Sequence, residues 1–188
     1  RVEVAPNKFR TFPRGSLIRI AEWYGCSDQP NVGLKMPSGK VALGIKEFEA
    51  GMRMRGPNGE SLPMRVMPGP ADSSIGDVND EQSTSIKDTM ARLGVHWLDA
   101  DKGPGSRKNG WEKMREMFAA SADPAPEAAG LWVFDTCRHF IRTVPILPRD
   151  EKKPEDVDTK AEDHCGDETR YRVLAASRVA KRTSFSPL

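Results

Sequence analysis

The residues best suited to carry chemistry are acidic and lie near the C-terminal end of the chain. Asp163 and Asp167 are four residues apart, so a helix places both carboxylates on one face, one turn from each other. Like charges this close repel each other unless a cation lies between them. A hard divalent cation such as Mg²⁺ takes oxygen ligands and keeps several waters, so it needs only a few carboxylates from separate elements. The pair is therefore a candidate part of a divalent-cation site.

Further carboxylates lie where strands are predicted to end. Asp72 and Asp135 each come shortly after an apolar, strand-like run, and in α/β sheets functional groups gather where strands give way to loops. Glu22 stands near the end of the first predicted strand. These three residues are the candidates from outside the C-terminal helix.

Each of these acidic residues also has a purely structural interpretation. Carboxylates at a helix N-terminus, such as Asp163 and Asp167, are favoured by the helix dipole without any metal. Asp72 follows Gly-Pro-Ala and can cap a turn through its own side chain, and Asp135 can act as a cap in the same way. Glu22 is equally suited to be an edge charge that discourages strand pairing.

Zinc and the common nucleotide or hydrolase motifs are poorly supported. Cys137 with His139, and His164 with Cys165, supply four soft ligands. Neighbouring residues in a helix cannot easily bind one tetrahedral ion, and structural zinc sites favour gaps of two to four residues. The chain also lacks a phosphate-binding GxxxxGK[ST], a GxGxxG after a strand and a GxSxG. Nothing therefore indicates an ATPase, a dinucleotide enzyme or a serine hydrolase.

Composition is that of an ordinary globular chain. Its 188 residues are 37% hydrophobic and 30% charged, which fits one domain with a core of its own. No run approaches the roughly 20 apolar residues of a membrane span, and three cysteines without a CxxC pair favour reduced thiols in a cytosol. The net charge of +2 does not by itself indicate nucleic-acid binding. Arg1 in place of an initiator Met suggests a piece of a longer chain.

Hydrophobic periodicity positions these residues on alternating strands and helices. A run near 149–160 is polar and proline-broken, and residues 177–188 form a basic tail expected to fray. The alternation predicts an α/β fold with a mostly central sheet and helices on its faces. The expected strands are 17–24, 62–66, 95–98 and 131–134, and the expected helices are 41–52, 83–93, 111–118, 137–144 and 163–176.

Several strings, taken in order, resemble one protein family, the C-terminal nuclease domain of the large terminase subunit of tailed bacteriophages. The resemblance spans nearly the whole chain. The strings are PRGSLIR (13–19), EWYG (22–25), NVGL (31–34), ADSSI (71–75), VFDTCR (133–138), and EDH (162–164) with DETRY (167–171).

The resemblance implies an RNase H-like fold, a central mixed sheet flanked by helices, with an acidic cluster that binds two Mg²⁺ or Mn²⁺ ions. Asp72 matches the second acidic position of the family, and Asp163 and Asp167 carry the third; which of the two binds metal directly stays open. The first metal aspartate of the family lies on an opening strand that has no counterpart here. Glu22 is a further candidate ligand, and His164 and Asp135 are expected just outside the ligand set.

The resemblance also implies an activity and partners. The family cuts concatemeric double-stranded DNA during genome packaging, and two metal ions would activate a water and stabilise the departing 3′ oxygen. Expected partners are the portal protein, the small terminase subunit and an ATPase domain upstream in the same polypeptide, in the cytoplasm of a host bacterium. Two other interpretations stay open: a non-catalytic module that docks on DNA or portal, and a resolvase- or transposase-like nuclease. The residues expected to hold the DNA backbone are Arg107, Lys108, Arg170 and Arg172.

Overall fold

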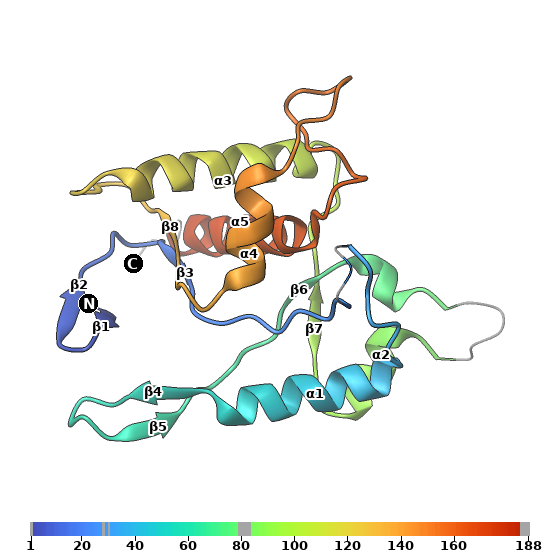
Figure 1. Cartoon of the computed structure of the whole chain (residues 1–188), viewed down its shortest axis with the longest axis horizontal. Coiled ribbons are helices and arrows are strands. Elements are labelled where there is room, and N and C mark those ends of the chain that lie inside the picture. The colour runs from blue at the N-terminus through green and yellow to red at the C-terminus, as the bar shows by residue number, and fades with distance from the viewer. Residues whose placement is uncertain (1, 28, 30, 79–83, 185–188) are drawn as a thin grey trace. The chain divides into compact units, whose positions relative to one another are not determined.

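The computed structural model describes residues 2–27, 29, 31–78 and 84–184. Contacts group the chain into two compact units: Arg1–Glu22 together with Asp101–Leu188, and Trp23–Ala100. We predicted one domain over residues 1–188, and that stays a prediction. Each unit is described by itself, and Figure 1 labels the elements of both.

The first unit combines two small sheets with three helices among its described residues. Strands β1 and β2 form an antiparallel hairpin, whereas β3 and β8 pair in parallel, with Leu17 opposite Leu131. The hairpin was not expected, because residues 1–16 carry little apolar pattern. The elements are β1 (Val2–Ala5), β2 (Lys8–Arg10), β3 (Leu17–Arg19), α3 (Ser106–Ala122), β8 (Leu131–Val133), α4 (Arg138–Thr143), the 3-10 turn η2 (Val144–Ile146) and α5 (His164–Ser184).

The core of this unit lies between α3, α5 and the β3–β8 pair. Helix α3 presents Trp111, Met114 and Met117 to the interior at helical spacing. Tyr171 and Val173 of α5 are buried with them. The apolar periodicity that predicted both helices is therefore the feature that joins them.

Helices α3 and α5 pack together, and each carries a glycine where the other comes close. A Cβ on Gly110 would clash with the buried side chain of Arg170. A Cβ on Gly166 would lie 2.6 Å from the Trp111 ring and 3.0 Å from Leu147. Small residues at these two positions permit the close approach that brings the start of α3 beside the start of α5.

The second unit has a smaller core. Ala42, Met90 and Val95 are buried together, and β6 pairs in parallel with β7, Gly69 lying opposite Trp97. Strands β4 and β5 form an antiparallel hairpin. The elements are α1 (Ser38–Gly51), β4 (Arg53–Arg55), β5 (Ser61–Pro63), β6 (Gly69–Ala71), the 3-10 turn η1 (Ser73–Gly76), α2 (Ile86–Arg92) and β7 (Trp97–Asp99).

The predicted α/β class is confirmed, but the described residues do not form one central sheet. They form sheets of two strands each, with strands of three or four residues. Gly69–Ala71, which we expected to end a strand, is itself strand β6, because parallel pairing with β7 outweighs the poor strand propensity of Gly and Pro. An RNase H-like central sheet is therefore not seen in these residues.

Two further expectations concern helices. Thr136 was expected to cap the helix after β8, yet α4 begins at Arg138 and Cys137 occupies its N-cap without a side-chain hydrogen bond. Ile141, predicted on the inner face, is exposed. Helix α5 continues through residue 184, so most of the predicted tail is helical, while 185–188 lie outside the described residues.

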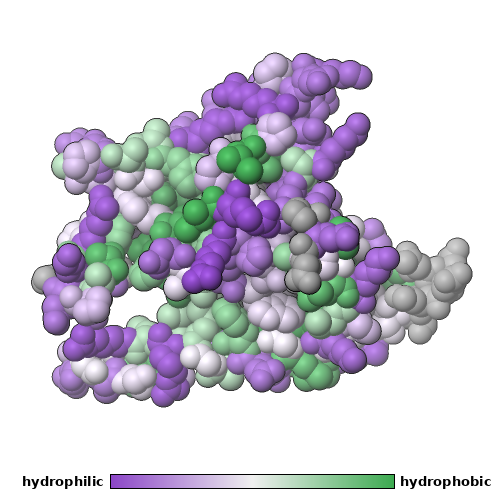
Figure 2. All heavy atoms as spheres, viewed as in Figure 1, coloured by the Kyte–Doolittle hydropathy of each residue, from purple (hydrophilic) through white to green (hydrophobic). Residues whose placement is uncertain are grey.

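Apolar side chains also reach the surface, as Figure 2 shows on one face. The most exposed large ones include Ile146 and Met67. Within the part of the chain that the structure describes, no helix has the length and apolar character needed to cross a membrane.

Candidate functional site

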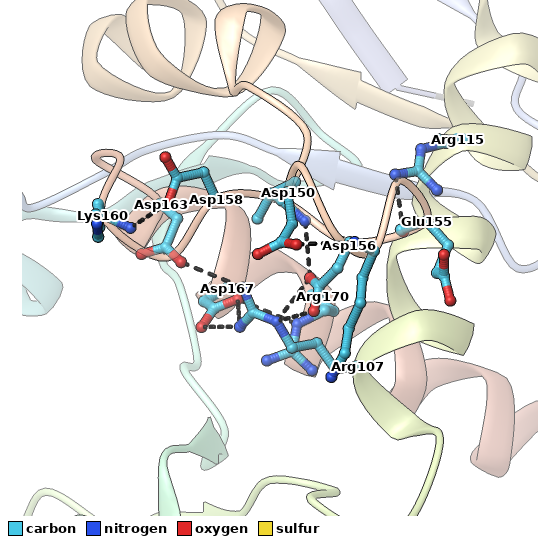
Figure 3. Close-up of polar contacts among 12 residues, drawn as sticks. Arg107, Arg115, Asp150, Glu155, Asp156, Asp158, Lys160, Asp163, Asp167 and Arg170 are labelled. Carbon is cyan, nitrogen blue, oxygen red and sulfur yellow. Dashed lines mark hydrogen bonds and ion pairs between the residues drawn. The ribbon is translucent and has the colours of Figure 1, made fainter.

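The guanidinium of Arg107 lies among three carboxylates in the first unit (Figure 3). Its Nε donates to both carboxylate oxygens of Asp156, at 2.7 and 2.9 Å. Its Nη1 lies 3.2 Å from both oxygens of Asp167, and its Nη2 lies 3.5 Å from Oδ2 of Asp163. We call Arg107, Asp156, Asp163 and Asp167 the acidic cluster. Every nitrogen of the guanidinium thus faces a carboxylate.

Local structure explains how the two helical members reach this cluster. Helix α5 begins at His164, directly after Asp163, and Asp167 lies in its first turn. The backbone N–H of Asp167 donates to the carbonyl of Asp163 at 2.8 Å. The prediction that these two carboxylates share one side of a helix start is therefore confirmed.

The other two members come from the start of α3 and from the loop before α5. Arg107 is the second residue of α3, after Gly105, whose φ of 78° lies in the left-handed region that glycine tolerates. Asp156 is fixed within its loop, because its carboxylate accepts from the N–H of Val157 and its carbonyl accepts from the N–H of Asp150. The loop thus presents Asp156 rigidly to Arg107.

Burial and charge shape the electrostatics of the cluster. Burial raises the pKa of Asp163, and the neighbouring Asp167 carboxylate raises it further, while Arg107 opposes the shift. For Arg107, burial works against the charge, but Asp167, Asp156 and Asp163 together raise its pKa. The guanidinium is accordingly held in its charged form by the carboxylates around it.

Arg170 is a second cation on the same carboxylates. Its side chain is only 3% exposed, and its Nε lies 3.2 Å from Oδ1 of Asp167. Its guanidinium also stacks over the Tyr171 ring, at 4.5 Å from the centroid. Asp167 is thus shared between Arg107 and Arg170, so both of these predicted DNA-contacting arginines pair with a predicted metal ligand.

The remaining predicted DNA contacts are open to solvent. Lys108 is exposed and lies 3.7 Å from Glu155 Oε1, a weak surface pair. Arg172 is exposed on α5. These two side chains are available for a ligand in a way that Arg107 and Arg170 are not.

Glu22 works as a helix cap. Its buried carboxylate accepts from the backbone N–H of His139 at 2.5 Å and from that of Phe140 at 3.1 Å. These N–H groups belong to the first turn of α4 and have no partner within the helix. Glu22 thus supplies the cap that we expected from Thr136, from a position 117 residues earlier in the chain.

The other predicted site residues lie apart from this cluster or outside its contacts. Asp72 belongs to the second unit, where it is the N-cap of η1 and its Oδ1 accepts from Ser74 N at 2.9 Å. Asp135 and His164 are exposed. The structure therefore brings Asp163 and Asp167 together in one unit and carries Asp72 on the other.

The donor set of the acidic cluster is chemically right for Mg²⁺ or Mn²⁺, since all three donors are carboxylates. In this conformation, however, the position between the carboxylates is taken by the Arg107 guanidinium. Over the described residues, no group of three or more His, Cys, Asp or Glu side chains has the arrangement of a metal site. The residues as arranged therefore do not fit a divalent cation.

Sequence reasoning missed two participants. Asp156 lies in an acid-rich run that we interpreted only as a polar loop, and its contact partner is 49 residues away. Arg19 of β3 pairs with Glu168 of α5 at 2.5 Å and lies over the Phe140 ring. The concentration of acidic residues from 150 to 168 was the one signal pointing to a nearby cation.

Comparisons with known protein families, with curated proteins and with solved structures returned no match for this chain.

Proposed function

We propose that the chain is the metal-dependent endonuclease domain of a phage or prophage large terminase. It would cleave concatemeric double-stranded DNA during genome packaging, with Mg²⁺ or Mn²⁺ supplying water activation. An RNase H-like fold, a host-cytoplasmic location, and the portal protein, small terminase subunit and upstream ATPase domain as partners are parts of the same proposal. Its basis in the sequence is the ordered set of strings, PRGSLIR to DETRY, that resemble this family.

The observation that carries the proposal is the convergence of Asp156, Asp163 and Asp167 on one point. Three carboxylates seldom gather unless a cation compensates them, because burying unpaired charge costs several kcal/mol. The raised pKa of Asp163, caused by burial and by Asp167, is typical of carboxylates at functional sites. Structural ion pairs produce the same signature, so the proposal needs a chemical test.

DNA would be held through its phosphates. Lys108 and Arg172 are exposed in the first unit. In the second unit, Arg53 is an exposed strand residue of the β4–β5 hairpin, and Arg65 is exposed shortly after it. Such contacts bind the DNA backbone without reading its sequence.

The test is nicking of supercoiled plasmid by the full-length protein in Mn²⁺. We expect Asp72→Ala and Asp163→Ala each to reduce nicking by at least about 10²-fold, since loss of one charge-stabilising group typically costs that much. Asp77→Ala, an exposed aspartate that follows η1, serves as the matched control and should cut normally. Unchanged nicking by Asp72→Ala and Asp163→Ala would refute the proposal.

A second candidate function is a docking module that grips DNA or the portal without chemistry. The observation that favours it is the occupation of the acidic cluster by Arg107. Calorimetry with Mn²⁺ and with duplex DNA separates the two functions. DNA or portal binding with no heat of Mn²⁺ binding and no nicking would support the docking module.

A further inference from the structure

We propose that Arg107 is the resident counter-ion of the acidic cluster and sets its affinity for divalent cations, which bind only when the guanidinium leaves. The inference rests on the proposed nuclease function, since it assumes that the carboxylates bind a metal at some stage. Arg107 is thus a positioning residue, acting through Asp163 and Asp167.

The contacts make Arg107 and a divalent cation mutually exclusive. Its Nη1 lies 3.2 Å from both oxygens of Asp167, and its Nη2 faces Oδ2 of Asp163. A metal ion binds carboxylate oxygens at about 2.0–2.6 Å. Any ion that uses Asp167 and Asp163 together must displace this guanidinium, because like charges repel strongly where water is largely excluded.

Arginine cannot vacate the site by losing its proton. The guanidinium stays protonated at any physiological pH, and the carboxylates around it raise its pKa further after burial has opposed the charge. The exchange must therefore be a movement of the side chain. Its side chain is 29% exposed, so one side of the guanidinium already meets solvent.

The backbone around Arg107 does not help to retain it. Arg107 is the second residue of α3, where the positive end of the helix dipole disfavours a cation. The carboxylates therefore supply the retention, and Asp156 supplies the shortest contacts, at 2.7 and 2.9 Å. A DNA phosphate offers the same bidentate geometry as a carboxylate, so arriving DNA is a competing acceptor for the released guanidinium.

Asp156 allows the idea to be tested without altering Asp163 or Asp167. Asp156→Asn keeps the shape of the side chain but weakens the hold on Arg107 Nε. Arg107→Gln removes the charge altogether. Arg115→Gln is the matched control, because Arg115 is exposed on the same helix and donates to the carbonyl of Glu155, outside the acidic cluster.

The measurement is calorimetric titration of the full-length protein with MnCl₂ alone, after thermal melts have shown that each variant is folded. We expect Arg107→Gln to bind Mn²⁺ at least about tenfold more tightly than the unaltered protein, equivalent to about 1.4 kcal/mol. Asp156→Asn should bind with intermediate affinity, and Arg115→Gln should match the unaltered protein. If Arg107→Gln does not fold, Asp156→Asn decides the question.

The outcomes separate this inference from the proposed function. Equal Mn²⁺ affinity in all four proteins, with normal nicking, overturns the role of Arg107 and leaves the nuclease intact. Tighter binding by Arg107→Gln, with no nicking by any protein, supports the counter-ion and overturns the nuclease. Absence of Mn²⁺ binding in every protein overturns both.

Discussion

At the scale of single residues, burial in the first unit changes how acidic and thiol groups titrate. Asp163 and Cys165 lie two positions apart at the start of α5, and both are buried. For each, burial is the first cause of a raised pKa. A buried group resists taking on charge, and this resistance can be measured at both positions.

Asp163→Asn should stabilise the protein at neutral pH. The folded-state pKa of Asp163 lies above its unfolded value of about 4, so between these values the folded state binds more protons and stability falls as pH rises. We expect a gain on the order of 1 kcal/mol at pH 7, a common size for one site, that disappears below about pH 4. Urea denaturation of both proteins at several pH values measures this difference. A pH-independent loss of stability would contradict the electrostatic explanation.

The thiols should differ in reactivity. Burial raises the pKa of Cys165 to about 11, with Glu22 adding to the shift and Arg19 opposing it, and burial also raises the pKa of Cys137. Cys26 is only partly buried. At pH 8 a disulfide reagent should therefore label Cys26 in the folded protein and the other two only after unfolding. Peptide mapping identifies the labelled cysteines, and early labelling of Cys165 would contradict its burial.

At the scale of elements, the crossing of α3 and α5 depends on small residues. Gly166→Ala would press a methyl group against the buried Trp111 ring. We expect a loss of about 1–3 kcal/mol, the usual cost of overpacking. Gly51→Ala is the control, because Gly51 ends α1 and has open space where a Cβ would lie. Thermal melts compare them, and equal stability of the two variants would show that the helices can move apart freely.

The start of α4 depends on a long-range cap. Glu22→Ala removes the acceptor of two first-turn N–H groups, so we expect a loss of about 1–2 kcal/mol. Glu22→Gln keeps one acceptor oxygen and should be less destabilised. Glu47→Ala, on the exposed side of α1, provides the matched control for denaturation curves. A loss of Mn²⁺ binding without a loss of stability in Glu22→Ala would instead make Glu22 a ligand.

At the scale of the whole molecule, charge balance matters more than net charge. The formal charge is only +2, so DNA affinity must come from cations that carboxylates do not already hold. Lys108 and Arg172 are exposed, whereas Arg170 is buried against Asp167. The candidate contacts therefore divide into those open to phosphate and those used to hold the fold.

Salt dependence distinguishes these two kinds of cation. Replacing Lys108 and Arg172 together by Gln should lower the slope of log affinity against log salt by about 0.9 for each phosphate that the protein no longer neutralises. Arg170→Gln should leave the slope unchanged and lower stability instead. Fluorescence anisotropy with a labelled duplex over a KCl series measures the slope. A reduced slope in Arg170→Gln would mean that Arg170 leaves Asp167 to bind DNA.

Local sequence determined much of the architecture. Apolar spacing predicted the helix around Trp111 and Met114, and the four-residue interval placed Asp163 and Asp167 on one side of a helix start. Both are properties of a single helix turn, which follow from 3.6 residues per turn whatever lies beyond it. The α/β class followed from the same alternation of local patterns.

Tertiary structure decided which groups compensate one another. Arg107 meets Asp156 across 49 residues and Glu22 caps a helix 117 residues later, contacts that no local period encodes. The short strand pairs, including the glycine and proline of β6, likewise depend on a partner elsewhere in the chain. The reason is physical: burial of charge and of unpaired backbone groups is tolerated only where folding delivers a partner.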